Sequence, residues 1–166
     1  MRTLGLTFAR SLMLVLLAGC AALWPVPLDV PPGHRAVLGR VDLAGFEVPE
    51  ATLDILKEDG TFNATVSAGP GRRDFALALP PGRYRVTRIV AIKDRSTPSV
   101  SGWPLNLAFE VGPEPAVYIG TLRVGSTLGS AVRVSVVDEY EDTLRALRAL
   151  YSDLPQPVTR RLLTPA

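Results

Sequence analysis

The chain has 166 residues, with 18 Lys and Arg against 16 Asp and Glu, one cysteine and one histidine, and its length suits one ordinary domain. The single cysteine excludes an internal disulfide. One cysteine and one histidine are also too few nitrogen and sulfur ligands for a typical zinc site. The near balance of charge disfavours a nucleic-acid-binding protein, because such domains are strongly basic.

The first residues have the composition of an export signal. Arg2 and Arg10 make a basic start, no acidic residue precedes Asp29, and residues 11–24 carry no charge. This apolar run is shorter than the roughly twenty residues that a helix needs to span a bilayer, and Pro25 follows it. It suits the hydrophobic region of a secretory signal peptide.

The segment Leu17-Ala18-Gly19-Cys20 at the end of this run resembles the lipobox of bacterial lipoproteins. In that family the cysteine thiol receives a diacylglycerol, the chain is cut before the cysteine, and the new amino terminus is acylated. The resemblance implies that residues 1–19 are removed and that Cys20 is lipidated; the alternative is a short anchor helix with an incidental cysteine. By similarity to enterobacterial lipoproteins, Ala21 in place of Asp favours the outer membrane. We therefore expect a lipid-anchored envelope protein that faces the periplasm and has no cofactor besides the covalent lipid.

Cleavage before Cys20 removes two arginines and no acid, so the remaining 147 residues have 16 basic and 16 acidic side chains. This neutrality removes the charge argument for a nucleic-acid or polybasic membrane contact. Residues 20–34 hold the lipidated cysteine and the proline-rich stretch Trp24–Gly33, and proline blocks both helix and central strand. We expect an extended tether that holds the domain off the lipid surface.

Residues 35–138 predict a β-sandwich. Short runs of alternating or β-branched residues are separated by Gly, Pro and Asp turns, without alternation of strands and helices. Asp59-Gly60 marks a tight hairpin, and residues 94–103 read as a polar, proline-containing loop. The expected strands are 35–43, 51–56, 61–67, 74–79, 84–93, 105–111, 116–124 and 130–138. They indicate an antiparallel, immunoglobulin-like sandwich of about 7–8 strands.

The stretch Val37–Ile92 has a resemblance of its own. It contains a G-x-V opening strand, a D-G-x-F hairpin and an L-P-P-G-x-Y turn before a long strand, and it is similar to carboxypeptidase-regulatory or prealbumin-like sandwiches. Pro81 presets φ, Gly82 permits a positive φ, and Tyr84 is expected to pack under the turn. The resemblance implies a fold and supplies no catalytic residues. The expected core residues are Val37, Leu53, Ile55, Phe75, Leu77, Tyr84, Val86, Ile89, Phe109, Tyr118, Ile119, Val134 and Val136.

Residues 139–166 are predicted to form a C-terminal helix and tail, because they begin with an apolar stripe at helical spacing. The members of the stripe are Tyr140, Leu144, Leu147, Tyr151 and Leu154. Asp138 with Glu141 predicts a capping box, and Pro155 ends the helix. The stripe either packs across an open face or edge of the sandwich, docks a partner through Leu144, Leu147 and Tyr151, or lies on a membrane surface.

Few residues suggest catalysis. His34, the only histidine, lies in the tether, which is no rigid frame for a catalytic triad. The acids around the Asp59-Gly60 hairpin lack the spacing of a calcium loop, so we expect a solvated turn and no metal. Trp103 is the main candidate for binding. If its side chain is exposed in the predicted loop, it is a typical binding hot spot, and together with Arg95 it would line a contact with a peptide or glycan.

The sequence thus predicts a non-catalytic interaction or accessory module whose partner is an envelope protein or a glycan. One alternative is a carbohydrate- or peptide-binding envelope protein that uses Trp103 and the arginines of its loops. Another is an envelope hydrolase with paired carboxylates, since sixteen acids allow a close pair.

Overall fold

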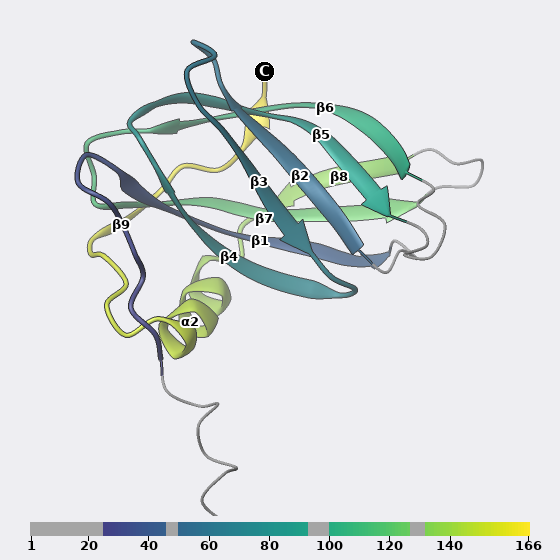
Figure 1. The fold of residues 1–166 in the computed structure, drawn as a ribbon. Helices are drawn as coiled ribbons and strands as arrows, with labels where there is room; N and C mark the ends of the chain where they lie inside the picture. Colours follow the sequence, from purple (N-terminus) through teal and green to yellow (C-terminus); the bar gives the residue numbers. More distant parts are fainter. Residues whose placement is uncertain (1–24, 46–49, 93–99, 127–131) are drawn as a thin grey trace, which may run out of the picture.

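The computed structural model describes residues 25–45, 50–92, 100–126 and 132–166. Two sheets pack face to face, and one helix, α2 (Tyr140–Leu150), covers the outer face of the first sheet (Figure 1). The first sheet has the order β4-β1-β7-β8, with β9 beside β7, and consists of β1 (Arg35–Gly45), β4 (Arg72–Leu79), β7 (Ala116–Ser126), β8 (Val132–Val137) and β9 (Val158–Arg160). The second has the order β10-β6-β5-β2-β3 and consists of β2 (Glu50–Lys57), β3 (Asn63–Ala68), β5 (Gly82–Ile92), β6 (Val100–Val111) and β10 (Thr164–Pro165).

The mainly β architecture confirms the prediction in outline and corrects it in detail. The first sheet is mixed, because β7 runs parallel to both β1 and β9. Alternating hydrophobicity shows which face of a strand is buried but not the direction of its neighbour, so the predicted purely antiparallel sandwich is wrong here. The strands β9 and β10 add to the expected set.

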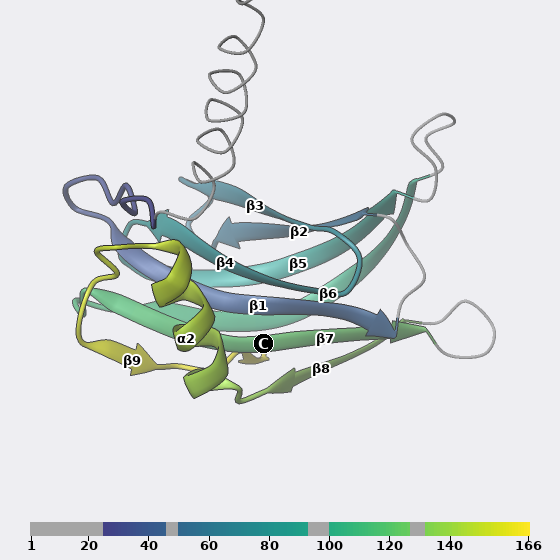
Figure 2. The same ribbon diagram turned by 90° about the horizontal axis from the view of Figure 1, so that it is seen from below.

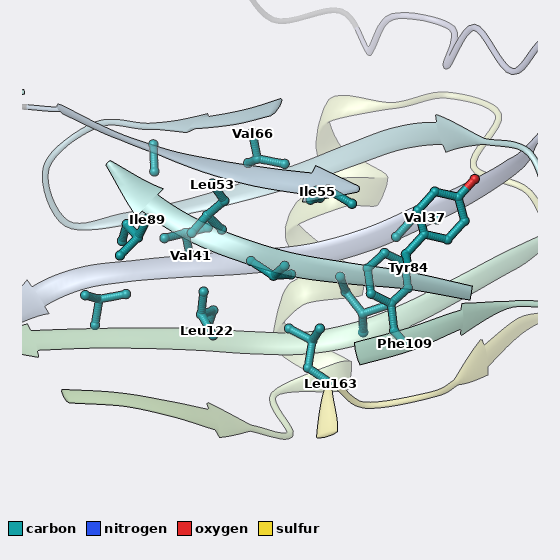
Figure 3. Packing of buried hydrophobic residues seen from close by; sticks show 14 of the residues in the cluster. Val37, Val41, Leu53, Ile55, Val66, Tyr84, Ile89, Phe109, Leu122 and Leu163 are labelled. Atoms are coloured by element: carbon teal, nitrogen blue, oxygen red, sulfur yellow. The ribbon is translucent and has the colours of Figure 1, made fainter. Parts of the chain in front are cut away.

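The main core lies between the sheets, and the turn before β5 is built as its sequence predicts. Gly82 has φ +149°, and the Tyr84 hydroxyl donates a hydrogen bond to the carbonyl of Pro80 at 2.6 Å. The Tyr84 ring stacks on Phe109, with ring centroids 5.4 Å apart (Figure 3). Burial raises the pKa of Tyr84 to about 12, so its hydroxyl stays protonated and remains a donor.

The expected core residues divide into three groups. Most are buried between the sheets, as predicted. Phe75, Leu77, Val134 and Val136 are only partly buried and pack against that core. Tyr118 is fully buried on the other face of the first sheet, in a separate cluster with the helix.

That second cluster lies under α2, which crosses β1 and β7 (Figure 2). Leu144 and Leu147 are 1% and 0% exposed and pack against the cluster that contains Ala36 and Leu38 of β1. The apolar stripe therefore covers the sandwich face, which is the first of the three predicted arrangements. Tyr151 is partly buried against the same cluster.

The predicted capping box at the start of α2 is wrong. Glu139 is the N-cap and makes no side-chain capping bond, while the Oδ1 atom of Asp138 accepts from the N–H of Tyr140 at 3.1 Å. The Glu139 carboxylate is instead bound by Arg40 and Arg123. Two arginines on the sheet offer this carboxylate charge-assisted contacts, so it turns toward the sheet.

The described part of the expected tether is docked on the domain. The N–H of Val26 donates to the carbonyl of Leu150 at 2.9 Å, and the N–H of Leu28 donates to Asp153 at 2.7 Å. Leu28 and Val30 pack against the cluster under the helix. The side chains of Leu28 and Val30, between Pro27 and Pro31, thus bind the segment to the helix side of the sandwich.

The substitution Leu147→Ala tests the contribution of the helix cluster. Removing a fully buried leucine leaves a cavity and costs about 2–5 kcal/mol of the free energy of unfolding, measured by urea denaturation. The matched control Leu150→Ala removes a side chain that is 52% exposed, so we expect a change of less than about 0.5 kcal/mol. Equal losses for both variants would show that α2 is not anchored by this face.

Candidate functional site

One side of the sandwich is open, between the edge strands β6 and β8. The short strand β10 pairs with β6 at Leu107 and Ala108, and the N–H of Ala166 donates to the carbonyl of Asn106. Over the rest of its outer edge, β6 has no paired strand among the described residues, and β8 pairs only with β7 there. Two strand edges therefore flank the gap between the sheets.

The gap contains a hollow of about 450 Å³, lined by residues 104–107 of β6, residues 134–136 of β8, Leu163 and Pro165. Six partly buried apolar side chains, at every second position of the two strands, pack against the main core. These six side chains are Trp103, Leu105 and Leu107 on β6 and Val132, Val134 and Val136 on β8. We call this hollow with its six side chains the β6–β8 slot.

Trp103 is a strand residue, which corrects its predicted place in a polar loop. It lies opposite Ile89 in the pairing of β6 with β5 and packs against the main core. The period-two pattern of Trp103, Leu105 and Leu107 places all three on the inward face of β6. Arg95, its predicted companion, and Cys20 lie outside the described residues.

The C-terminal segment shows how an extended chain fits between the sheets. Leu163 is 6% exposed in the main core, close to Phe109 (Figure 3). Its N–H donates to the carbonyl of Ile119 in the first sheet, and the residues after it pair with β6 of the second sheet. An extended segment thus bridges both sheets with one leucine inserted between them.

A chain of alternating arginines and carboxylates crosses the outer face of the first sheet beside the start of α2. Its members, in order of contact, are Arg72, Asp42, Arg123, Glu139, Arg40 and Asp74. Arg40 and Asp42 are buried, and the Nε atom of Arg40 lies 2.6 Å from Oδ1 of Asp74. We call this set the Arg–carboxylate network.

The electrostatics of the Arg–carboxylate network favour the charged forms of Arg40 and Glu139. The hydrogen bond to Asp74 raises the pKa of Arg40 further. Burial acts to raise the pKa of Glu139, but hydrogen bonding and the charge of Arg123 outweigh burial and leave this pKa below its ordinary value. A general acid at neutral pH needs a raised pKa, and that of Glu139 is lowered. The ion pairs of this carboxylate with Arg40 and Arg123 instead suit it to fixing α2 on the sheet. The sequence signal for this network is the pair of charged residues Arg40 and Asp42, at alternate positions of an otherwise apolar strand.

The acidic residues in and beside the hairpin between β2 and β3 are also engaged in hydrogen bonds and ion pairs. Asp59 accepts bonds from the hydroxyl and the N–H of Thr61, which lower its pKa to about 2. Glu58 pairs with Arg85, and Asp54 pairs with Arg88. Among the described residues, no group of three or more His, Cys, Asp or Glu is placed to hold a metal ion.

No protein-family model matches the chain, and neither a curated protein nor a solved structure is significantly similar to it. In the part of the chain that the structure describes, no helix is long and apolar enough to cross a membrane.

The substitution Glu139→Gln tests the network. It removes one of the two carboxylates that face each of Arg40 and Arg123, and we expect a loss of about 1–3 kcal/mol in the free energy of unfolding at pH 7. The lowered pKa of Glu139 in the folded protein gives a stabilisation that is present above its ordinary value of 4.5 and lost as pH falls through the folded-state pKa.

Urea denaturation across pH 3–7 should therefore show the difference between the wild type and Glu139→Gln shrinking on the acid side. The control Glu141→Gln changes a carboxylate whose side chain is 73% exposed, and it should be nearly neutral at every pH. A Glu139→Gln deficit that is independent of pH would contradict the role assigned to the carboxylate charge.

Proposed function

We propose that this protein is a lipid-anchored, non-catalytic module of the bacterial cell envelope that binds an extended, apolar polypeptide segment in the β6–β8 slot. Lipid on Cys20 would hold the protein at a membrane, as the lipobox resemblance implies. Ala21 after the cysteine favours the outer membrane, with the domain facing the periplasm. The observation that supports binding is the slot itself, where two strand edges carry six inward apolar side chains.

The chemistry of the slot favours a polypeptide partner. Strand edges offer backbone donors and acceptors to an added strand, and pockets for alternate side chains supply the selectivity. The period of two on both walls suits a partner with an apolar residue at every second position. Pro104 has no N–H, so it discourages indiscriminate pairing at this edge and leaves side-chain fit as the main selector.

The other readings have less support from the described residues. A glycan site needs exposed aromatic and polar groups, whereas Trp103 is partly buried in an apolar row. A hydrolase with paired carboxylates needs one acid with a raised pKa. The carboxylates that the network brings together, Asp42, Asp74 and Glu139, are each bound by arginine.

Photo-crosslinking in living cells tests the proposal. A photoreactive amino acid at Ser135, which lines the slot on β8, should give a crosslinked polypeptide adduct of the full-length protein. The matched control is the same amino acid at Ser67, an exposed serine on the opposite edge strand β3, which should give none.

A second variant links the adduct to the apolar wall. Adding Val134→Thr places a hydroxyl in the slot with little change of shape. It should reduce the yield of the crosslinked adduct at position 135 without altering the abundance of the protein. Equal adducts from Ser135 and Ser67, or no adduct from Ser135, would contradict the proposed binding site.

A further inference from the structure

Two residues with exposed, large hydrophobic side chains are joined through their backbones at the C-terminal end of α2. Val26 is 57% exposed and Leu150 is 52% exposed, and a backbone hydrogen bond of 2.9 Å joins the two residues. Neighbouring Pro25, Pro27 and Ala149 are also exposed. We call these five residues the foot.

The foot is held firmly on the domain. The carbonyl of Val26 accepts from the N–H of Ser152 at 3.1 Å, and Val26 forms a parallel bridge with Tyr151. Immediately after it, Leu28 is bound to Asp153 and packs under the helix. The position of the foot therefore fixes the orientation of the whole sandwich.

The foot also lies close in the chain to the proposed lipid. Pro25 is the fifth residue after Cys20, and the four residues between them are apolar, Ala21-Ala22-Leu23-Trp24. Five residues span at most about 18 Å when fully extended. Acyl chains on Cys20 would thus keep Pro25, the first residue of the foot, within about 18 Å of the lipid surface, whatever the conformation of the link.

We propose that the foot rests in the headgroup region of the membrane that holds Cys20 and orients the domain on it. This inference rests on the proposed lipid anchor. The charged residues nearest in sequence to the foot are Arg148, Asp29 and Asp153, of mixed sign, so charge attraction is not the driving force. Exposed Val, Leu and Pro side chains favour shallow insertion at the boundary between headgroups and acyl chains.

This orientation has a consequence for the slot. The helix lies on the outer face of the first sheet, so the second sheet lies on the side away from the lipid (Figures 1 and 2). The slot between the two sheets then stays open to the periplasm instead of facing the bilayer. The foot would therefore keep the proposed binding site accessible.

Fluorescence quenching in reconstituted vesicles tests the inference. The acylated protein carries a fluorophore on Ala149→Cys, because Cys20 is blocked by its lipid, and the vesicles contain phosphatidylethanolamine and phosphatidylglycerol with acyl chains brominated near the headgroup. We expect strong quenching at position 149 that does not change with salt. A fluorophore on the control variant Ser67→Cys should show none.

A double substitution separates contact from anchoring. Val26→Asp with Leu150→Asp, in the Ala149→Cys background, should lose the quenching while the protein still floats with the vesicles. Because both residues are exposed, the domain should keep its circular dichroism spectrum. Quenching that survives this double change would overturn the role of the foot.

The anchor has its own readout, the mass of the N-terminal peptide of the purified protein. Acylated protein that floats with vesicles but shows no more quenching at 149 than at 67 would overturn the foot and leave the anchor intact. An N-terminal peptide without lipid on Cys20 would overturn the anchor, and the foot with it.

Discussion

Both faces of β1 are buried, and the other elements are arranged around this strand. Val37, Val41 and Leu43 point into the core between the sheets, while Ala36 and Leu38 lie under α2. A strand buried on both faces must be covered by a further layer. The helix supplies that layer, which is why its apolar stripe is used within the chain and is not available to a partner.

The same strand accounts for the Arg–carboxylate network. The outer face of β1 continues from Ala36 and Leu38 to the buried residues Arg40 and Asp42. Buried charges are tolerated only when they are paired, so carboxylates and arginines from β4, β7 and the helix start gather around them. Glu139 is drawn into this set, and the start of α2 is fixed by ion pairs instead of a cap.

The sequence predicted the elements that local patterns specify. Alternation and turn residues located the eight longer strands, and the proline–glycine–tyrosine turn before β5 formed with Tyr84 packed under it as predicted. The features it missed depend on contacts between distant segments. The strands β9 and β10 are three and two residues long, too short to carry a periodic signal. They form because parts of the edges of β7 and β6 are free to pair. The docked segment before β1 and the end of α2 at Leu150 likewise depend on each other through the bond from Val26.

The proposed function uses two apolar features in different parts of the sandwich. The foot lies at the end of α2, on the side from which Cys20 would reach the lipid, and the slot lies between the sheets at the opposite strand edges. The central claim is that a partner strand adds to the slot. Hydrogen–deuterium exchange of the acylated protein tests it most directly, by comparing isolated envelopes with purified protein in detergent. We predict slower amide exchange in envelopes over 100–106 and 132–137, with no change over the opposite edge strand, 63–68. Identical exchange in both preparations would contradict the claim.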